Sequence, residues 1–182
     1  GGGVSPGAVQ GLHEKAFDTA PVRKAFFRAY AEAHALLVSH LGHAQRGEAP
    51  ADSVAQGLLE LLLFLCFIQK KGWLNREPGY LYTRLQDHCR RSPDGDTFHW
   101  RVLRPLFRSL CSPGRTGACA PGVPFLNAAL CGLWPELRPG AAGGADPFAV
   151  GNSTFRAVFD ILFERFDFTV TENTPANVDV AV

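Results

Sequence analysis

The chain has 182 residues, a hydrophobic content of 46% and a formal net charge of +1, which exclude a disordered chain and allow one domain with a sizeable core. Its N-terminus, GGGVSPG, has neither the charged nor the apolar stretch of a secretory signal peptide. The sequence contains no methionine and begins at Gly1, so we expect an excised segment of a longer protein. We expect residues 1–20 to form a flexible N-terminal segment and residues 21–182 to form a single helical domain.

The first predicted helix begins with Pro21, which suits a first helical turn, and continues to about Gln45. Its apolar residues recur at spacings of three and four, as in an amphipathic helix: Val22, Phe26, Tyr30, Ala33, Leu37, Leu41 and Ala44. The following GEAPADS segment predicts a turn, and Asp52 or Ser53 is the expected N-cap of the next helix.

The second predicted helix contains the most distinctive string of the chain, LLELLLFLCFIQKKGWLN, at residues 58–75. Its apolar block is shorter than the roughly 20 residues of a membrane span, and Glu60 interrupts it. We therefore predict a central core helix that is buried on nearly all sides, ends at Lys71 and has Gly72 as its C′ residue.

Two further helices and a long loop follow. A third helix is expected over 80–91, and Asp96 is the expected cap of a fourth helix, which Pro105 should kink. Residues 112–152 are rich in Gly, Pro and Ala and predict a long loop, in which VPFLNAALCGLW is an apolar anchor against the helices.

The last long helix is predicted after Asn152 or Ser153 as its cap, and DFTVTENT then predicts an extended exit. The expected fold class is mainly α. It is an irregular helical bundle around one buried central helix, with a long Gly/Pro-rich loop and a short extended C-terminal segment.

Positive charge is concentrated in the middle of the chain. Residues 70–115 contain ten basic and four acidic residues, whereas the rest contains eight basic and thirteen acidic ones. A basic middle with acidic ends favours a local contact with phosphate. The candidate DNA-backbone contacts are the two adjacent basic pairs, Lys70–Lys71 and Arg90–Arg91. Each pair also ends a predicted helix, where cations complement the helix dipole without any DNA.

Four strings occur in the order found in a known family: FLCFIQKKGWLN, LRPLFRSLC, VPFLNAAL and FRAVFDILFERFDFTVTENTPANVDVAV. Together they resemble the helical connector region of bacterial type IIG restriction–modification enzymes and their phage-defence relatives, which are single-chain adenine-N6 DNA methyltransferases. Ala128-Ala129 and Cys131 depart from the family pattern, which has Gly-Gly and an aromatic residue at these places. The resemblance implies a cytoplasmic parent enzyme, with no membrane segment, that uses S-adenosylmethionine, and Mg²⁺ if a nuclease is attached.

No catalytic, cofactor-binding or metal-binding residue is predicted in this chain. It lacks the Asn/Asp-Pro-Pro-Tyr/Phe tetrapeptide of an adenine methyltransferase, and no lysine follows Lys71 to complete a restriction-nuclease site. We therefore predict a non-catalytic spacer or scaffold whose partners are the flanking methyltransferase domain, a nuclease domain if present, and DNA. The alternative is a stand-alone helical module for protein–protein interaction.

A third interpretation, a small metal-dependent enzyme, depends on scattered histidines and cysteines. His40 and His43 are spaced to share a helix face, but solvated histidines are commoner there than metal ligands. Cys111, Cys119 and Cys131 with His99 match no structural zinc class by spacing. The five cysteines are odd in number and irregularly spaced, which argues against a disulfide framework.

Overall fold

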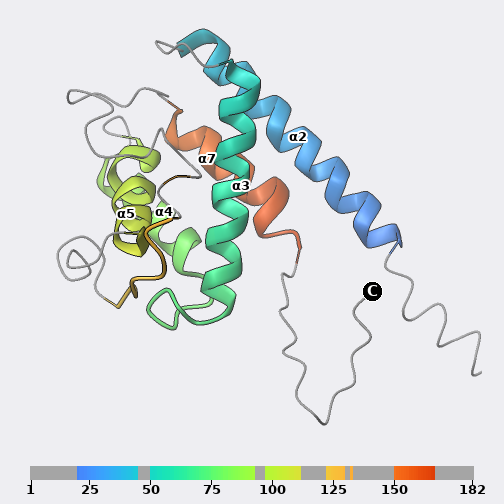
Figure 1. Cartoon of the computed structure of the whole chain (residues 1–182). Helices are drawn as coiled ribbons and strands as arrows, with labels where there is room; N and C mark the ends of the chain where they lie inside the picture. Colours follow the sequence, from blue (N-terminus) through green and yellow to red (C-terminus); the bar gives the residue numbers. More distant parts are fainter. Residues whose placement is uncertain are drawn as a thin grey trace, which may run out of the picture.

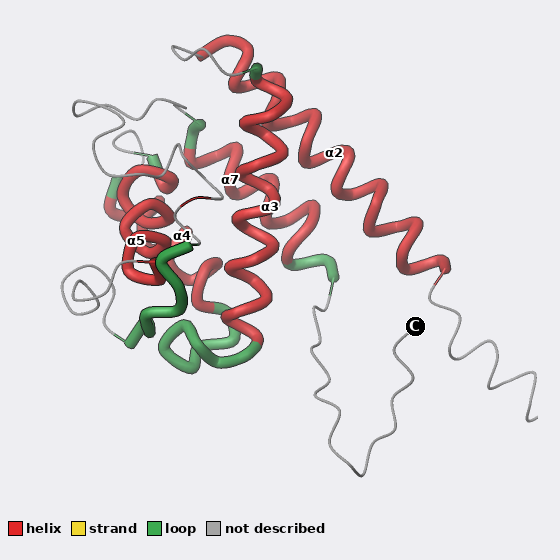
Figure 2. Tube along the Cα trace, viewed as in Figure 1, coloured by secondary structure: helices red, strands yellow, loops and turns green. Residues whose placement is uncertain are grey.

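The computed structural model describes residues 20–44, 50–92, 97–111, 122–129, 132 and 150–166. Within these ranges the chain is mostly helical and contains no strand (Figures 1 and 2), which confirms the predicted mainly-α class. The expected N-terminal segment, most of the expected long loop and the expected extended C-terminal segment lie outside the described residues.

The helices pack around one core, which is shared between two central segments. Helix α3 (Ala51–Lys70) contacts α2 (Ala20–Ala44) and α4 (Tyr80–Arg91). The segment formed by α7 (Asn152–Val158) and the π-helical turn η3 (Phe159–Phe163) also contacts both α2 and α4. Figure 1 shows α3 and the α7 segment between α2 and the α4–α5 side of the molecule.

Aromatic rings from the two sides of the core meet in edge-on contacts. Phe98 packs edge-on against Phe155, with 5.5 Å between ring centroids, and against Phe159 at 6.3 Å. All three side chains are almost fully buried. Rings in this arrangement stabilise a core beyond the apolar area that they bury.

Half of the residues of helix α3 are buried, so the helix is not buried on nearly all sides as predicted. Ten of its twenty residues are buried, whereas Phe67 keeps 44% of its surface exposed. It is also the one described helix that is long and apolar enough to cross a membrane. A core helix of a soluble protein has the same length and hydropathy, so this property is weak support for a membrane segment, and the structure is consistent with a soluble protein.

The end of α3 agrees with the sequence and its start does not. Gly72 has a φ of +76°, its N–H donates to the carbonyl of Gln69, and the N–H of Trp73 donates to Ile68. This pair of bonds is a Schellman motif with glycine at C′, as predicted. At the start, neither Asp52 nor Ser53 is the cap, because α3 begins one residue after Pro50 with no side-chain cap.

The VPFLNAAL string anchors to the helices as predicted. Val123 is buried, and the N–H groups of Leu126 and Asn127 donate to the carbonyl of Leu110 at the end of α5 (Arg104–Cys111). The Asn127 side chain accepts the N–H of Ala129 at 2.8 Å, which closes the turn through an Asx bond. Alanine is therefore compatible with this turn, since neither alanine at 128–129 has a positive φ.

Asn152 caps a different helix from the one predicted. Helix α7 begins at Asn152, and no side chain caps its N-terminus. The Asn152 carboxamide instead accepts the N–H of Phe98 at 2.8 Å and donates to the carbonyl of Ser92 at 3.3 Å. It thereby joins α7 to the residue after α4 and to the start of the next helix, a long-range contact that a local capping rule does not detect.

Candidate nucleic-acid interface

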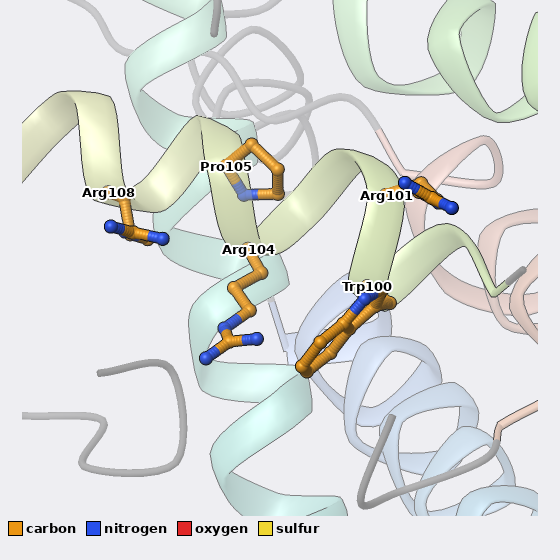
Figure 3. Close-up of a pocket in the computed structure, with 5 residues that line it drawn as sticks. All are labelled: Trp100, Arg101, Arg104, Pro105 and Arg108. Carbon is orange, nitrogen blue, oxygen red and sulfur yellow. The ribbon is translucent and has the colours of Figure 1, made fainter. Parts of the chain in front are cut away.

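Three arginines and a tryptophan line one pocket on the helix that spans residues 99–111. The pocket has a volume of about 320 Å³ and is lined by Trp100, Arg101, Arg104, Pro105 and Arg108 (Figure 3). The arginines follow one another at spacings of three and four, which places them on one side of a helix. Three of the five described lining residues are arginines, and none of the five is acidic.

A π-helical turn positions these side chains. The turn η1 (His99–Leu103) begins after Thr97, whose hydroxyl accepts the N–H of Trp100 at 3.2 Å. The N–H of Arg104 then donates to the carbonyl of His99, five residues back. The expected cap, Asp96, lies outside the described residues, and the Thr97 hydroxyl satisfies an N–H at this helix start.

Pro105 gives a physical reason for the π turn. Proline lacks an N–H, and its ring would clash with the carbonyl four residues back, that of Arg101. The wider π turn directly before Pro105 is where the helix departs from regular α geometry, at the position where a kink was predicted. Single π turns of this kind occur frequently at functional sites.

Arg104 is a charged side chain that is almost entirely buried. Only 8% of its surface is exposed, and its guanidinium lies 4.0 Å from the centre of the Trp100 ring. Stacking on the ring offsets part of the cost of removing the charge from water. Arg101 is exposed and Arg108 is half-buried, so the three arginines that line the pocket range from nearly buried to exposed.

This arrangement is suited to binding an oxyanion. Arginine stays protonated at all physiological pH values, and its planar fork matches the oxygens of phosphate or carboxylate in paired hydrogen bonds. These arginines were not predicted from the sequence, because the prediction was based on adjacent basic residues. The pattern that marks them is a row of arginines at helical spacing beside a tryptophan, within the same basic segment, 70–115.

The four candidate residues selected from the sequence lie elsewhere. Lys70 and Lys71 end α3, and Arg90 and Arg91 are exposed at the end of α4. Arg90 forms an ion pair with Asp87 one turn back. None of the four lines the arginine pocket. At these positions the four cations could contact DNA or could complement the dipole of the helix that they end. The DNA contact at these pairs therefore stays a prediction.

A second pocket, of about 490 Å³, lies between the ends of α3 and η3 and includes Lys70 and Cys66. The Cys66 thiol is free, and burial raises its pKa to about 12; Glu164 adds to the rise and Lys70 opposes it. The thiol is therefore protonated at neutral pH and is neither a nucleophile nor a ready metal ligand.

The residues proposed for a metal site are not gathered in the described part of the chain. His99 is fully buried, and the Nδ1 of His40 donates to the carbonyl of Leu36. Cys111 is disulfide-bonded, contrary to the prediction that the cysteines form no disulfide framework. Cys119 and Cys131 lie outside the described residues. Within the described ranges no group of three His, Cys, Asp or Glu residues is placed to hold a metal ion.

Comparison with known proteins gave no relative. No protein-family model, no curated protein and no solved structure matches the chain.

Proposed function

We propose that this chain is a non-catalytic helical spacer or scaffold of a bacterial DNA adenine-N6 methyltransferase or type IIG-like restriction–modification enzyme, in which it touches the DNA backbone. The four ordered strings that resemble this family support the proposed parent enzyme. The observation that carries the DNA contact is the pocket that Arg101, Arg104 and Arg108 line together with Trp100.

The pocket suits phosphate better than base edges. Its cations lie along one helix side, and Arg101 and Arg108 are accessible at either end of the buried Arg104. Such contacts bind and orient a nucleic acid without reading its sequence. A scaffold with this property would hold the DNA in register for the neighbouring domains.

The chemistry belongs to the flanking domains in this proposal. The methyltransferase domain would bind S-adenosylmethionine, and a nuclease domain, where present, would bind Mg²⁺. We place the parent enzyme in the bacterial cytoplasm, where it would defend against phage.

One experiment tests both halves of the proposal. The purified chain is mixed with fluorescent duplex DNA and labelled S-adenosylmethionine, and DNA binding and methyl transfer are measured together. We expect binding at about 50 mM salt that weakens strongly by about 200 mM, without methyl transfer. Methyl transfer by the chain alone, or absence of binding at low salt, would contradict the proposal.

The alternative function is a stand-alone module for protein–protein interaction. It is favoured by large apolar side chains that remain exposed in the described part of the chain: Val22, Phe27, Phe67, Trp73 and Phe125. A chain that binds no DNA under any salt condition would support this alternative.

A further inference from the structure

Helix α2 has a second, outward face opposite the one that joins the core. Its buried side carries a regular row of apolar residues, Ala29, Ala33, Leu37 and Leu41. The opposite side exposes another row one turn apart, formed by Phe27, Ala31 and Ala35. Figure 1 shows α2 along the outer edge of the helical assembly. The exposed row is therefore available at the surface.

Phe27 is a large apolar anchor that is held in place. Its side chain is 64% exposed, and its ring packs edge-on against Phe26 with 5.9 Å between centroids. Phe26 in turn packs edge-on against Phe166 at 5.5 Å. Exposed aromatic rings that are fixed by a supporting ring are typical anchors of protein interfaces.

Three cations surround Phe27 near the start of α2. Arg23, Lys24 and Arg28 are all exposed, and the first acidic residue of the described helix is Glu32, four positions after Arg28. Arg23 and Lys24 lie close to the start of α2, where the positive end of the helix dipole disfavours positive charge. No ion pair in the described part of the chain involves any of the three. An acidic partner would relieve this unfavourable arrangement.

We propose that this face of α2 docks an acidic amphipathic helix of a protein partner. The apolar stripe of the partner would lie on Phe27, Ala31 and Ala35, where the two small side chains allow close approach of the helices. Its carboxylates would face Arg23, Lys24 and Arg28. The row of apolar groups favours a helix over nucleic acid, because a phosphate backbone offers nothing to bury against Phe27. This inference does not depend on the proposed function.

The test uses two synthetic helical peptides of roughly 20 residues, long enough to form a helix, with the same leucine stripe. One peptide has glutamates beside the stripe and the other has lysines. Fluorescence anisotropy measures their binding to the whole chain. We expect the glutamate peptide to bind and Phe27→Ala to weaken it at least tenfold. The matched control, Phe67→Ala, removes an exposed phenylalanine from α3 and should bind as the unaltered chain does.

Charge reversal completes the test. In the Lys24→Glu/Arg28→Glu variant the peptide preference should invert, so that the lysine peptide binds better. Three outcomes overturn the inference: no binding of the glutamate peptide, equal binding of both peptides, or an equal loss in the two phenylalanine variants. Displacement of the bound peptide by duplex DNA would show instead that the face binds polyanions.

Discussion

The guanidinium of Arg104 lies 4.0 Å above the centre of the Trp100 ring, and both residues line the arginine pocket. The ring therefore holds a nearly buried charge at the base of a site whose outer arginines reach solvent. Trp100→Leu should lower the free energy of unfolding by about 1 kcal/mol more than Trp100→Phe, because phenylalanine keeps an aromatic face for the cation. Urea denaturation measures this difference. Equal losses in the two variants would mean that the stacking contributes no stability.

The core row of α3 predicts a large stability difference within one helix. Leu62 is fully buried, whereas Phe67 is 44% exposed. Leu62→Ala should cost about 2–5 kcal/mol of unfolding free energy, because it leaves a cavity. Phe67→Ala should change stability by no more than about 0.5 kcal/mol, as surface substitutions do. A small loss at Leu62 would show that α3 is not a core helix.

Two glycines provide a matched test of backbone conformation. A Cβ atom would meet nothing within 4 Å at either Gly72 or Gly79, but only Gly72 has a positive φ, +76°. Gly72→Ala should therefore destabilise the fold by about 1 kcal/mol through backbone strain alone. Gly79→Ala should be close to neutral. Thermal or urea unfolding of the two variants measures the difference, and equal effects would exclude a Schellman end at Gly72.

The buried thiol predicts a dependence of stability on alkaline pH. Burial raises the pKa of Cys66 from 9.0 to about 12, so between these values the unfolded chain loses the thiol proton while the folded chain keeps it. The free energy of unfolding should then fall as pH rises above 9, and Cys66 contributes up to about 1.4 kcal/mol per pH unit.

Below pH 9 the thiol is protonated in both states and contributes no pH dependence. Urea denaturation at a series of pH values should show a shallower alkaline fall for Cys66→Ala than for the unaltered chain. Cys89→Ala, which removes the other free thiol of the described residues, is the control. An identical alkaline fall in the chain and in Cys66→Ala would show that the thiol is not buried as described.

The helices were largely predictable from the sequence because their apolar residues repeat with the helical period. The third predicted helix, 80–91, coincides with α4, and α2 and α3 agree within one or two residues at their ends. The end of α3 was also predictable, since Gly72 supplies a conformation that other residues avoid.

The features that were not predictable depend on long-range contacts or on backbone geometry. Asn152 does not cap its own helix but accepts the N–H of Phe98, 54 residues away in the chain. The π turn η1 changes hydrogen-bond spacing without changing the apolar pattern, and only Pro105 marks it. The candidate site was missed for a related reason. Its three arginines are separated in the sequence and lie on one side of the helix only because of the helical repeat. A search for adjacent basic residues does not find them.

The salt dependence of DNA binding tests the central claim most directly. Arg101→Ala/Arg108→Ala removes the two accessible cations of the arginine pocket, and Arg90→Ala/Arg91→Ala removes the same net charge from the end of α4. For each, the affinity for a short duplex is measured over a range of salt concentrations. If the pocket contacts phosphate, the magnitude of the slope of log affinity against log salt should fall by about 2 in the pocket variant, and by less in the α4 variant. Equal slopes for the unaltered chain and the pocket variant, or an equal fall in both variants, would contradict the assignment of the DNA contact to this pocket.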